Sequence, residues 1–399
     1  MKDVVIVEAV RTAVGKFGGS LKPLNADTLA AEVMKAAVER TGIEKELVEE
    51  ISMGHCRQSS DFSNTARYAA LMAGFPEEIP ASTVMCACAS GMLATRDIFN
   101  LIRTGEIEIG IAGGTESMSN APFYLPNARW GVGTGTTELR DSLTEAQFRS
   151  QPIDIYGRFN MGMTAENIAE RMDISREDQD AFAYSSQLKA AAAIAEGKFK
   201  DEIVPLTVPQ GKKLPPITFD TDEFPRQTSP EKLAALKPVF KEGGTVTAGN
   251  SSGRNDGASA LLLMSAEKAA SLNLKPLAVI RGISSAGVDP RYMGLGPIPA
   301  TQKVLKMTGL SLDDIDLIEL NEAFAAQSLG CIHELGLTDR MDIINVNGGA
   351  IALGHPIGSS GSRIIVTLVH EMKKRAARYG LATLCVGGGM GMAAVVEAV

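Results

Sequence analysis

The sequence lacks the long apolar runs of a membrane protein and the basic surface of a nucleic-acid-binding protein, and we expect no secretion leader. No run approaches the ~20 apolar residues that a membrane-spanning helix needs. The first residues include Asp3 and are too short a stretch for the apolar part of a secretion signal. The net charge is −8 and no strongly basic stripe offsets it. We therefore expect neither a nucleic acid nor a membrane as partner.

Cysteine is also scarce. The five cysteines are odd in number and lack the spacing of a disulfide framework, so we expect reduced thiols and a cytoplasmic protein. No metal site is expected, because Cys86 and Cys88 have no second pair at ligand spacing and the four histidines are scattered. Cys56, Cys86 and Cys331 are predicted to be core residues.

Short β-branched runs alternate with amphipathic segments, which predicts an α/β fold with a mostly parallel sheet. At 399 residues the chain fits two or three domains. Residues 1–119 with 250–275, and residues 276–399, repeat one order: a strand enters a small-residue turn, a helix leaves it, and a later strand ends in glycines. We therefore predict two duplicated βαβαβ halves. Residues 120–249 break the pattern and are predicted to form a loop domain over the sheet.

The pattern also predicts individual elements. Strands are expected near residues 3–8, 50–54, 82–86, 108–112, 277–280, 315–320, 343–346, 381–386 and 392–397. Helices are expected from Asp27, as the cap, to about Gly42, near 65–73, from Ser90 to Arg103, after Ser175, from Ala300, after Glu322 and up to Tyr379.

Cys88 is the strongest candidate for chemistry. A predicted strand feeds a tight turn of small residues, and a helix is predicted from Ser90, so the thiol lies at or just before a helix N-terminus. Unpaired N–H groups and the helix dipole favour a thiolate there, and we expect a lowered pKa. A thiolate is a suitable nucleophile for a thioester. A buried structural cysteine is the alternative.

Three further segments carry candidate groups. His355 lies on a turn, where it can serve as a general base and as an oxyanion donor, although a turn histidine is often incidental. Cys385 ends a predicted strand, and the glycines that follow it precede another strand instead of the helix of a dinucleotide site. Asn321 and Glu322 open a helix at the end of a strand, where α/β active sites form. Simple helix capping by Asn321 is the alternative.

Together these segments, at residues 83–92, 321–325, 345–358 and 385–391, resemble the thiolase family. Residues 4–12, 111–119, 161–167 and 244–253 are also similar to family motifs, so the resemblance covers nearly the whole chain. It implies a five-layered αβαβα fold of two α/β halves, with a loop domain that covers the active site and binds coenzyme A. It further implies an acyltransferase that acts on acyl-CoA and forms homodimers or homotetramers.

The resemblance implies a role for each candidate. Cys88 would carry the acyl group, His355 would deprotonate it, and Cys385 would move a proton to or from the α-carbon of the second acyl-CoA. One oxyanion hole would use His355 and a water held by Asn321, and the other would use the N–H groups of Cys88 and Gly387. Substrate or coenzyme A contacts are implied for Ser252 (pantetheine), Arg226 (adenine), Asn160, Met161, Ala248 and Met293. The reaction requires no metal, nicotinamide or flavin, so no cofactor is expected.

The implied reaction is the reversible Claisen condensation of two acetyl-CoA molecules, a step of fatty acid metabolism. A degradative 3-ketoacyl-CoA thiolase of broader chain length is the alternative. Asn160 replaces a histidine of the short-chain biosynthetic thiolases, and Met85-Cys86 stands where many family members have an asparagine. An inactive scaffold that only binds coenzyme A is more remote. So is a serine hydrolase: residues 249–253 satisfy G-x-S-x-G, but no helix is expected after them.

Overall fold

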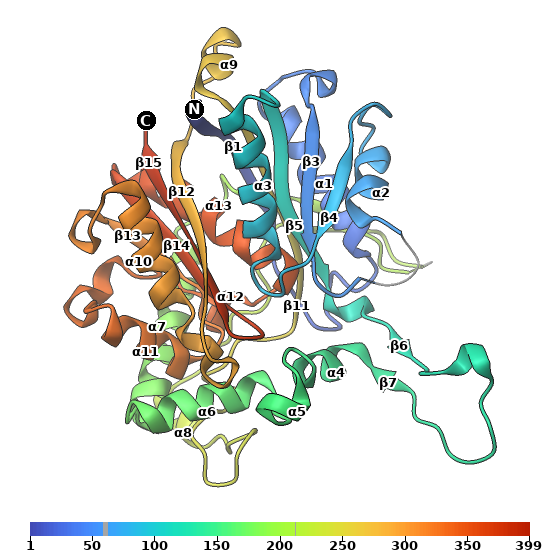
Figure 1. Cartoon of the computed structure of the whole chain (residues 1–399), viewed down its shortest axis with the longest axis vertical. Coiled ribbons are helices and arrows are strands. Elements are labelled where there is room, and N and C mark those ends of the chain that lie inside the picture. Colours follow the sequence, from blue (N-terminus) through green and yellow to red (C-terminus); the bar gives the residue numbers. More distant parts are fainter. Residues whose placement is uncertain (59–62, 212) are drawn as a thin grey trace.

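The computed structural model describes residues 1–58, 63–211 and 213–399, and a large mixed sheet lies at its centre (Figure 1). In the first half the strand order is β4 (Ala81–Val84), β3 (Glu50–His55), β5 (Ile109–Ser117), β11 (Asn255–Ser265) and β1 (Val4–Thr12). In the second half the order is β13 (Leu317–Leu320), β14 (Tyr379–Val386), β15 (Met390–Ala398) and β12 (Ala278–Gly287). The halves join where Val5 and Ile6 of β1 pair with β12.

The two halves repeat one topology. Outward from the junction, β1, β11, β5 and β3 occupy the positions that β12, β15, β14 and β13 occupy on the other side. The counterpart of edge strand β4 is a single bridge between Ile318 and Ile344. The strand predicted at 343–346 is reduced to this bridge, because a 3-10 helix (Thr338–Ile343) ends just before Ile344 and the chain turns at Asn345, which has a φ of +44°. The shared order agrees with an internal duplication.

The prediction of a mostly parallel sheet is wrong. β11 runs antiparallel to β1 and β5, and β15 runs antiparallel to β12 and β14. The parallel pairs of the main path are β3 with β4 and β5, and β13 with β14. The reason is visible at residues 387–389, where a tight glycine turn with positive φ at Gly388 and Gly389 reverses the chain from β14 into β15. A short turn joins antiparallel strands, whereas a parallel neighbour needs a long crossover.

Helices and sheet halves form the five layers (Figure 1). α1 (Ala26–Glu39) and α2 (Thr65–Met72) pack on the outer face of the first half, and α10 (Pro297–Thr308) packs with α11 (Ala325–Glu334) on the second. α3 (Ser90–Thr104) and α13 (Ile357–Arg375) lie between the halves. The α/β class and most predicted helices are confirmed. Asp27, however, lies in the first turn of α1 and is not its cap, which is Asn25.

The two central helices can approach closely because small residues line their contact. A Cβ on Gly91 of α3 would lie 2.4 Å from Ser362 Oγ, and one on Gly361 of α13 would lie 2.6 Å from the backbone nitrogen of Met92. Every residue of α13 from Gly358 to Met372 is buried. Because both helices follow a turn that carries a candidate catalytic residue, their contact brings the two turns together.

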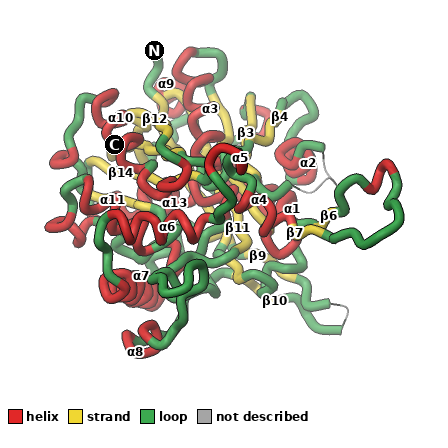
Figure 2. Tube along the Cα trace, turned by 60° about the horizontal axis from the view of Figure 1, so that its bottom comes forward, coloured by secondary structure: helices red, strands yellow, loops and turns green. Residues whose placement is uncertain are grey.

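The segment 120–249 spreads over one end of the sheets. Its helices are α4 (Ser142–Phe148), α5 (Ile153–Tyr156), α6 (Met161–Arg171), α7 (Arg176–Ala195) and α8 (Pro230–Ala234). Figure 2 shows α6 lying across that end. An arm with the short strands β6 (Phe123–Tyr124) and β7 (Arg140–Asp141) extends away from the body (Figure 1). No helix in the described part of the chain is long and apolar enough to cross a membrane.

Candidate active site

A cavity of about 370 Å³ lies between the two halves and the segment 120–249. Six of the residues singled out by the sequence line it: Cys88, Met161, Ser252, Met293, His355 and Gly387. These residues come from distant parts of the chain, so the fold brings them together. Among the described residues that line the cavity are Arg57 and Arg254 but no carboxylate, which favours an anionic or electron-rich ligand.

Cys88 lies on a tight turn between β4 and α3. Ala87 has a φ of +43°, and Ser90 Oγ holds the turn by accepting from the Cys86 N–H at 2.9 Å and donating to the Ala87 carbonyl at 2.7 Å. The predicted lowering of the Cys88 pKa is wrong. Burial raises the pKa to about 11 and outweighs the N–H group of Gly387 and the charge of Arg57, both of which favour the thiolate. The resting thiol is therefore protonated at neutral pH.

His355 is held by groups on both sides of its turn. The backbone N–H of His355 donates to Asn255 Oδ1 at 2.9 Å, and the ring nitrogen Nδ1 lies 2.6 Å from Ser360 Oγ. Gly354 has a φ of +98°, and a Cβ there would lie 2.6 Å from the Asn255 side chain. Burial, and next the charge of Arg363, lower the pKa of His355 to about 4. The imidazole is therefore neutral at pH 7, and its Nε2 has no partner among the described residues.

Cys385 lies behind the cavity wall, where it packs with Met161, Met293 and Phe324. Its side chain is fully buried. Burial, and next the proximity of Cys88, raise its pKa well above the usual value for a thiol. The structure thus places the two sulfurs near each other, with Gly387 of the following turn on the cavity surface.

Asn321 follows β13, and both polar atoms of its side chain are buried without a partner among the described residues. The capping alternative is wrong, because α11 begins at Ala325 and the residue before it is Phe324. An unpaired buried amide costs free energy unless something else satisfies it, and a bound water or substrate oxygen would do so.

Glu322 has a structural role. Its carboxylate accepts from Ser186 Oγ at 2.7 Å, from Asn345 Nδ2 at 2.8 Å and from the Ile351 N–H at 3.2 Å. These bonds connect α7 with the turn that leads to His355. Burial raises the pKa of Glu322.

Three predicted contact residues do not line the cavity. Asn160 caps α6, where its Oδ1 accepts from the Met163 N–H at 3.0 Å. Arg226 donates to the carbonyl of Ala248 at 3.1 Å and stacks on Phe224. Ala248 is exposed. Any contact of these residues with a ligand would lie outside the cavity.

Sequence reasoning missed an aromatic wall. Phe240 and Phe324 line the cavity with ring centroids 6.1 Å apart in an edge-to-face arrangement. Gly162 makes room for them, since a Cβ there would lie 2.3 Å from the Phe240 ring. Phe324 stands within the motif 321–325 that the sequence singled out, whereas nothing around Phe240 indicated its position.

Two other predictions concern serine and cysteine. Ser251 Oγ donates to the Thr247 carbonyl at 2.7 Å, and strand β11 follows instead of a helix, so residues 249–253 do not form a nucleophile elbow. Cys56 and Cys331 are buried, and Cys86 packs against the central core, as predicted.

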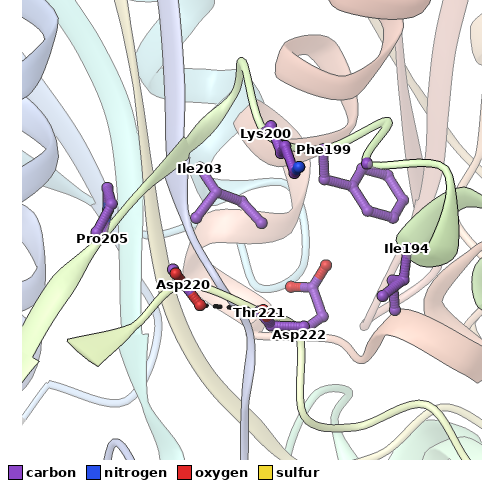
Figure 3. A pocket seen from close by; sticks show the side chains of 9 residues that line it. Ile194, Phe199, Lys200, Ile203, Pro205, Asp220, Thr221 and Asp222 are labelled. Atoms are coloured by element: carbon purple, nitrogen blue, oxygen red, sulfur yellow. Dashed lines mark hydrogen bonds between the residues drawn. The ribbon is translucent and has the colours of Figure 1, made fainter. Parts of the chain in front are cut away.

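A second cavity of about 270 Å³ lies around Asp222, among residues 194–205 and 220–222 (Figure 3). Both carboxylate oxygens of Asp222 already accept from the guanidinium of Arg11, at 2.7 and 2.9 Å. Thr221 Oγ1 donates to Asp220 at 3.0 Å. The described residues that line this cavity include neither a thiol nor an imidazole, so it lacks the reactive groups that line the first cavity.

Comparisons with known proteins agree with this geometry. The family model "Thiolase, N-terminal domain" matches residues 4–267, and "Thiolase, C-terminal domain" matches residues 274–398. An acetyl-CoA acetyltransferase of Syntrophomonas wolfei is 51% identical over 100% of this chain and 99% of its own. The crystal structure of the Bacillus anthracis acetyl-CoA acetyltransferase has a TM-score of 0.96 at 47% identity, covering 100% of this chain and 99% of that one. Human mitochondrial 3-ketoacyl-CoA thiolase in complex with CoA has a TM-score of 0.94 at 42% identity, covering 100% and 98%.

Proposed function

The chain belongs to the thiolase family and is an acyltransferase, and from this premise we propose that it joins two acetyl-CoA molecules into acetoacetyl-CoA and CoA through an acyl group on Cys88. The observation that carries the proposal is the convergence of Cys88, His355 and Gly387 on one cavity, with Cys385 directly behind it. Relatives of about 50% identity that are named acetyl-CoA acetyltransferase favour this reaction over a broader degradative thiolase.

In the proposed first half-reaction, the sulfur of Cys88 attacks the carbonyl carbon of acetyl-CoA while Nε2 of His355 takes the thiol proton. Because burial disfavours a free thiolate, proton transfer accompanies the attack. The N–H groups of Cys88 and Gly387 stabilise the oxyanion. The C–S bond to CoA then breaks, and the departing thiolate takes the proton of Cys385. This leaves acetyl-Cys88, an imidazolium and a Cys385 thiolate.

In the proposed second half-reaction, the Cys385 thiolate removes an α-proton from a second acetyl-CoA. The enolate oxygen accepts from Nε2–H of His355 and from a water held by Asn321, whose amide has no other partner. The α-carbon attacks the acetyl carbonyl, and the bond to Cys88 breaks. His355 returns its proton to Cys88, so all three groups regain their starting states. Thiols and an imidazole perform every proton transfer, so we propose that no metal, nicotinamide or flavin takes part.

The partners proposed are acyl-CoA and CoA, with Ser252 at the pantetheine arm and Arg226 near the adenine. The human thiolase structure in complex with CoA supports this class of ligand. Met161 and Met293, on the cavity wall, would contact the acyl group. We propose that Asn160 and Ala248 contact coenzyme A outside the cavity. We propose that the chain divides into three domains: a first α/β half of residues 1–119 with 250–275, a loop domain of residues 120–249, and a second α/β half of residues 276–399.

We also propose a homodimer or homotetramer in the cytoplasm. The arm between β6 and β7 exposes Phe123, Trp130 and Leu139, with 62%, 84% and 65% of their surfaces accessible, and apolar side chains on a projecting arm fit a second copy of the chain. All five cysteines are free, which fits a reducing compartment. Light scattering on the purified chain would measure the assembly, and a monomer would contradict the first proposal.

The test of function is thiolysis of acetoacetyl-CoA by CoA, followed through the enolate absorbance, with 3-ketoacyl-CoA of increasing chain length as competing substrates. We expect turnover to be greatest for acetoacetyl-CoA. Greater turnover of longer chains would favour the degradative reaction, and no turnover of any of them would favour a binding scaffold.

A further inference from the structure

The two nitrogens of the His355 ring have different surroundings. Nδ1 lies 2.6 Å from Ser360 Oγ, whereas Nε2 is buried without a partner among the described residues. Ser360 belongs to the first turn of α13 and is completely buried. Its hydroxyl is therefore the group that decides which ring nitrogen carries the hydrogen in the neutral imidazole.

The hydrogen can be assigned by counting donors. Ser360 Oγ also lies 2.9 Å from the carbonyl oxygen of Pro356, four residues earlier, which can only accept. A serine hydroxyl has one hydrogen, and donation to the carbonyl four residues back is a common arrangement in helices. The contact with His355 must then be donated by Nδ1–H. The neutral ring accordingly keeps its electron pair on Nε2.

We propose that Ser360 is a positioning residue for the reaction proposed above: its hydroxyl accepts from Nδ1–H of His355 and so keeps the electron pair of Nε2 available to the thiol of Cys88. The inference rests on the proposed function. One hydrogen bond serves both half-reactions. When Nε2 has taken the proton, Nδ1–H still donates to Ser360, and Nε2–H can donate to the enolate oxygen without any rotation of the ring.

The neighbouring serine provides a matched control. Ser359 is also buried on α13, but its hydroxyl bonds to Ser259 at 2.8 Å and does not contact His355. Ser360→Ala removes the hydroxyl that holds the ring, Ser359→Ala removes an equally buried hydroxyl, and Ser360→Thr keeps a hydroxyl at the same position.

The experiment measures kcat and KM of the full-length enzyme in the thiolysis of acetoacetyl-CoA. For Ser360→Ala we expect kcat to fall by about 10- to 100-fold, by analogy with the loss of the hydrogen-bond partner that orients a metal-bound histidine, with KM changed by less than about twofold. Ser360→Thr should recover most of kcat, and Ser359→Ala should match the parent. A Ser360→Ala variant with the kcat of the parent would overturn the proposal.

A spectroscopic readout separates the tautomer from any effect on folding. In protein labelled with 15N-histidine, His355 is one of four histidines, and its signals can be identified by comparison with His355→Gln. The parent should show a protonated Nδ1, and a protonated Nε2 would refute the assignment. If Ser360→Ala fails to fold, the proposal is tested by two other results: a protonated Nδ1 in the parent spectrum and recovery of most of kcat in Ser360→Thr. A parent with the expected spectrum but no turnover would refute the proposed function while leaving the tautomer assignment correct.

Discussion

Two opposing effects act on the thiol of Cys88. Burial disfavours the charged thiolate, while the N–H group of Gly387 and the guanidinium of Arg57 favour it. Burial is the larger effect, and the pKa is about 11. Since burial also keeps His355 neutral, the free enzyme holds an uncharged thiol and an uncharged imidazole on one cavity. Among the described residues, no direct hydrogen bond joins the Cys88 thiol to the His355 imidazole. Such a gap is common before substrate binds.

The raised pKa predicts how the alkylation rate of Cys88 depends on pH. Below its pKa the thiolate fraction increases about tenfold per pH unit, and the thiolate is the reactive form. The iodoacetamide rate assigned to Cys88, by subtracting the rate of Cys88→Ser, should therefore still be rising at about pH 9. A plateau below about pH 8 would show that the neighbouring donors outweigh burial.

Substitution of each sulfur should separate the two half-reactions. Cys88→Ser should fold normally yet form almost no acetyl adduct with acetyl-CoA, because a hydroxyl is a far weaker nucleophile than a thiol. Cys385→Ala should still acquire the adduct but condense at least about 100-fold more slowly, as expected when a general base is lost. Intact-protein mass spectrometry measures the adduct, with Cys86→Ala as control. A normal adduct on Cys88→Ser would disprove the assignment of the nucleophile.

The sequence predicts a site residue where its immediate neighbours already indicate a reactive position. Cys88, His355 and Gly387 stand in short turns of small residues whose composition already indicates a reactive position. Asn160 is expected to contact substrate or coenzyme A, and in the structure its amide caps α6, a use that side-chain type alone does not reveal. Arg57 and Phe240 reach the cavity only through the folding of β3 and of the segment 120–249, and no sequence spacing indicates this.

At the scale of elements, two strands of the first half hold the turn that carries His355. Asn255 of β11 accepts from the His355 N–H at 2.9 Å. Glu116 of β5 accepts from the Gly358 N–H at 2.9 Å and the Arg57 N–H at 3.0 Å. The turn of the second half that carries the imidazole is therefore positioned by two side chains of the first half, which fixes His355 relative to Cys88.

Glu116→Gln tests this connection. An amide nitrogen would face the N–H donors that the carboxylate now satisfies, so we expect a loss of about 2–3 kcal/mol in the free energy of unfolding and a lower kcat. Urea denaturation measures the first quantity. An unchanged stability would show that these bonds do not hold the turn.

The same prediction has a pH dependence. Burial alone would raise the pKa of Glu116. The hydrogen bonds from His55 and from the Arg57 N–H lower it by more, so the pKa of Glu116 lies below its usual value. The stabilisation by Glu116 is therefore present above the unfolded value of 4.5 and is lost as pH falls through the folded pKa. The stabilities of parent and Glu116→Gln should converge in acid.

Elements bounded by clear turn residues were predicted well, and those set by tertiary pairing were not. The helices at 65–72, 90–104 and 176–195 match their predictions closely. Strand β11 was missed, because it begins with Asn255-Asp256-Gly257, residues that favour turns. Its pairing with both β1 and β5 overrides that local preference.

For the whole molecule, the duplication explains how distant residues meet. Cys88 precedes α3 and His355 precedes α13, and these helices are equivalent members of the two halves that pack together in the central layer. Each half supplies the turn before its central helix and the glycine-containing strand beside it. The repeated order was visible in the sequence, but the antiparallel direction of five of the eight neighbouring strand pairs was not, because chain direction depends on the connections between strands.

The guanidinium of Arg11 connects the first strand with the segment that crosses it. Nε donates to Glu202 at 2.6 Å, and Nη1 and Nη2 donate to Asp222 at 2.7 and 2.9 Å. All three side chains are buried. Removing one member leaves the others charged and uncompensated, so Arg11→Met should lower the free energy of unfolding by about 3–5 kcal/mol, measured by urea denaturation.

Two comparisons identify the source of that loss. Arg281→Met removes an ion pair with Glu397 in which the arginine is 43% exposed, and it should cost no more than about 1 kcal/mol. Arg11→Met combined with Glu202→Gln and Asp222→Asn removes the charges of all three side chains, so most of the lost stability should return, since the penalty arises from unpaired carboxylates and not from the missing arginine. If the triple variant is no more stable than Arg11→Met, the lost stability comes from the contact of Arg11 with Phe199. The guanidinium carbon lies 4.9 Å from the centroid of that ring.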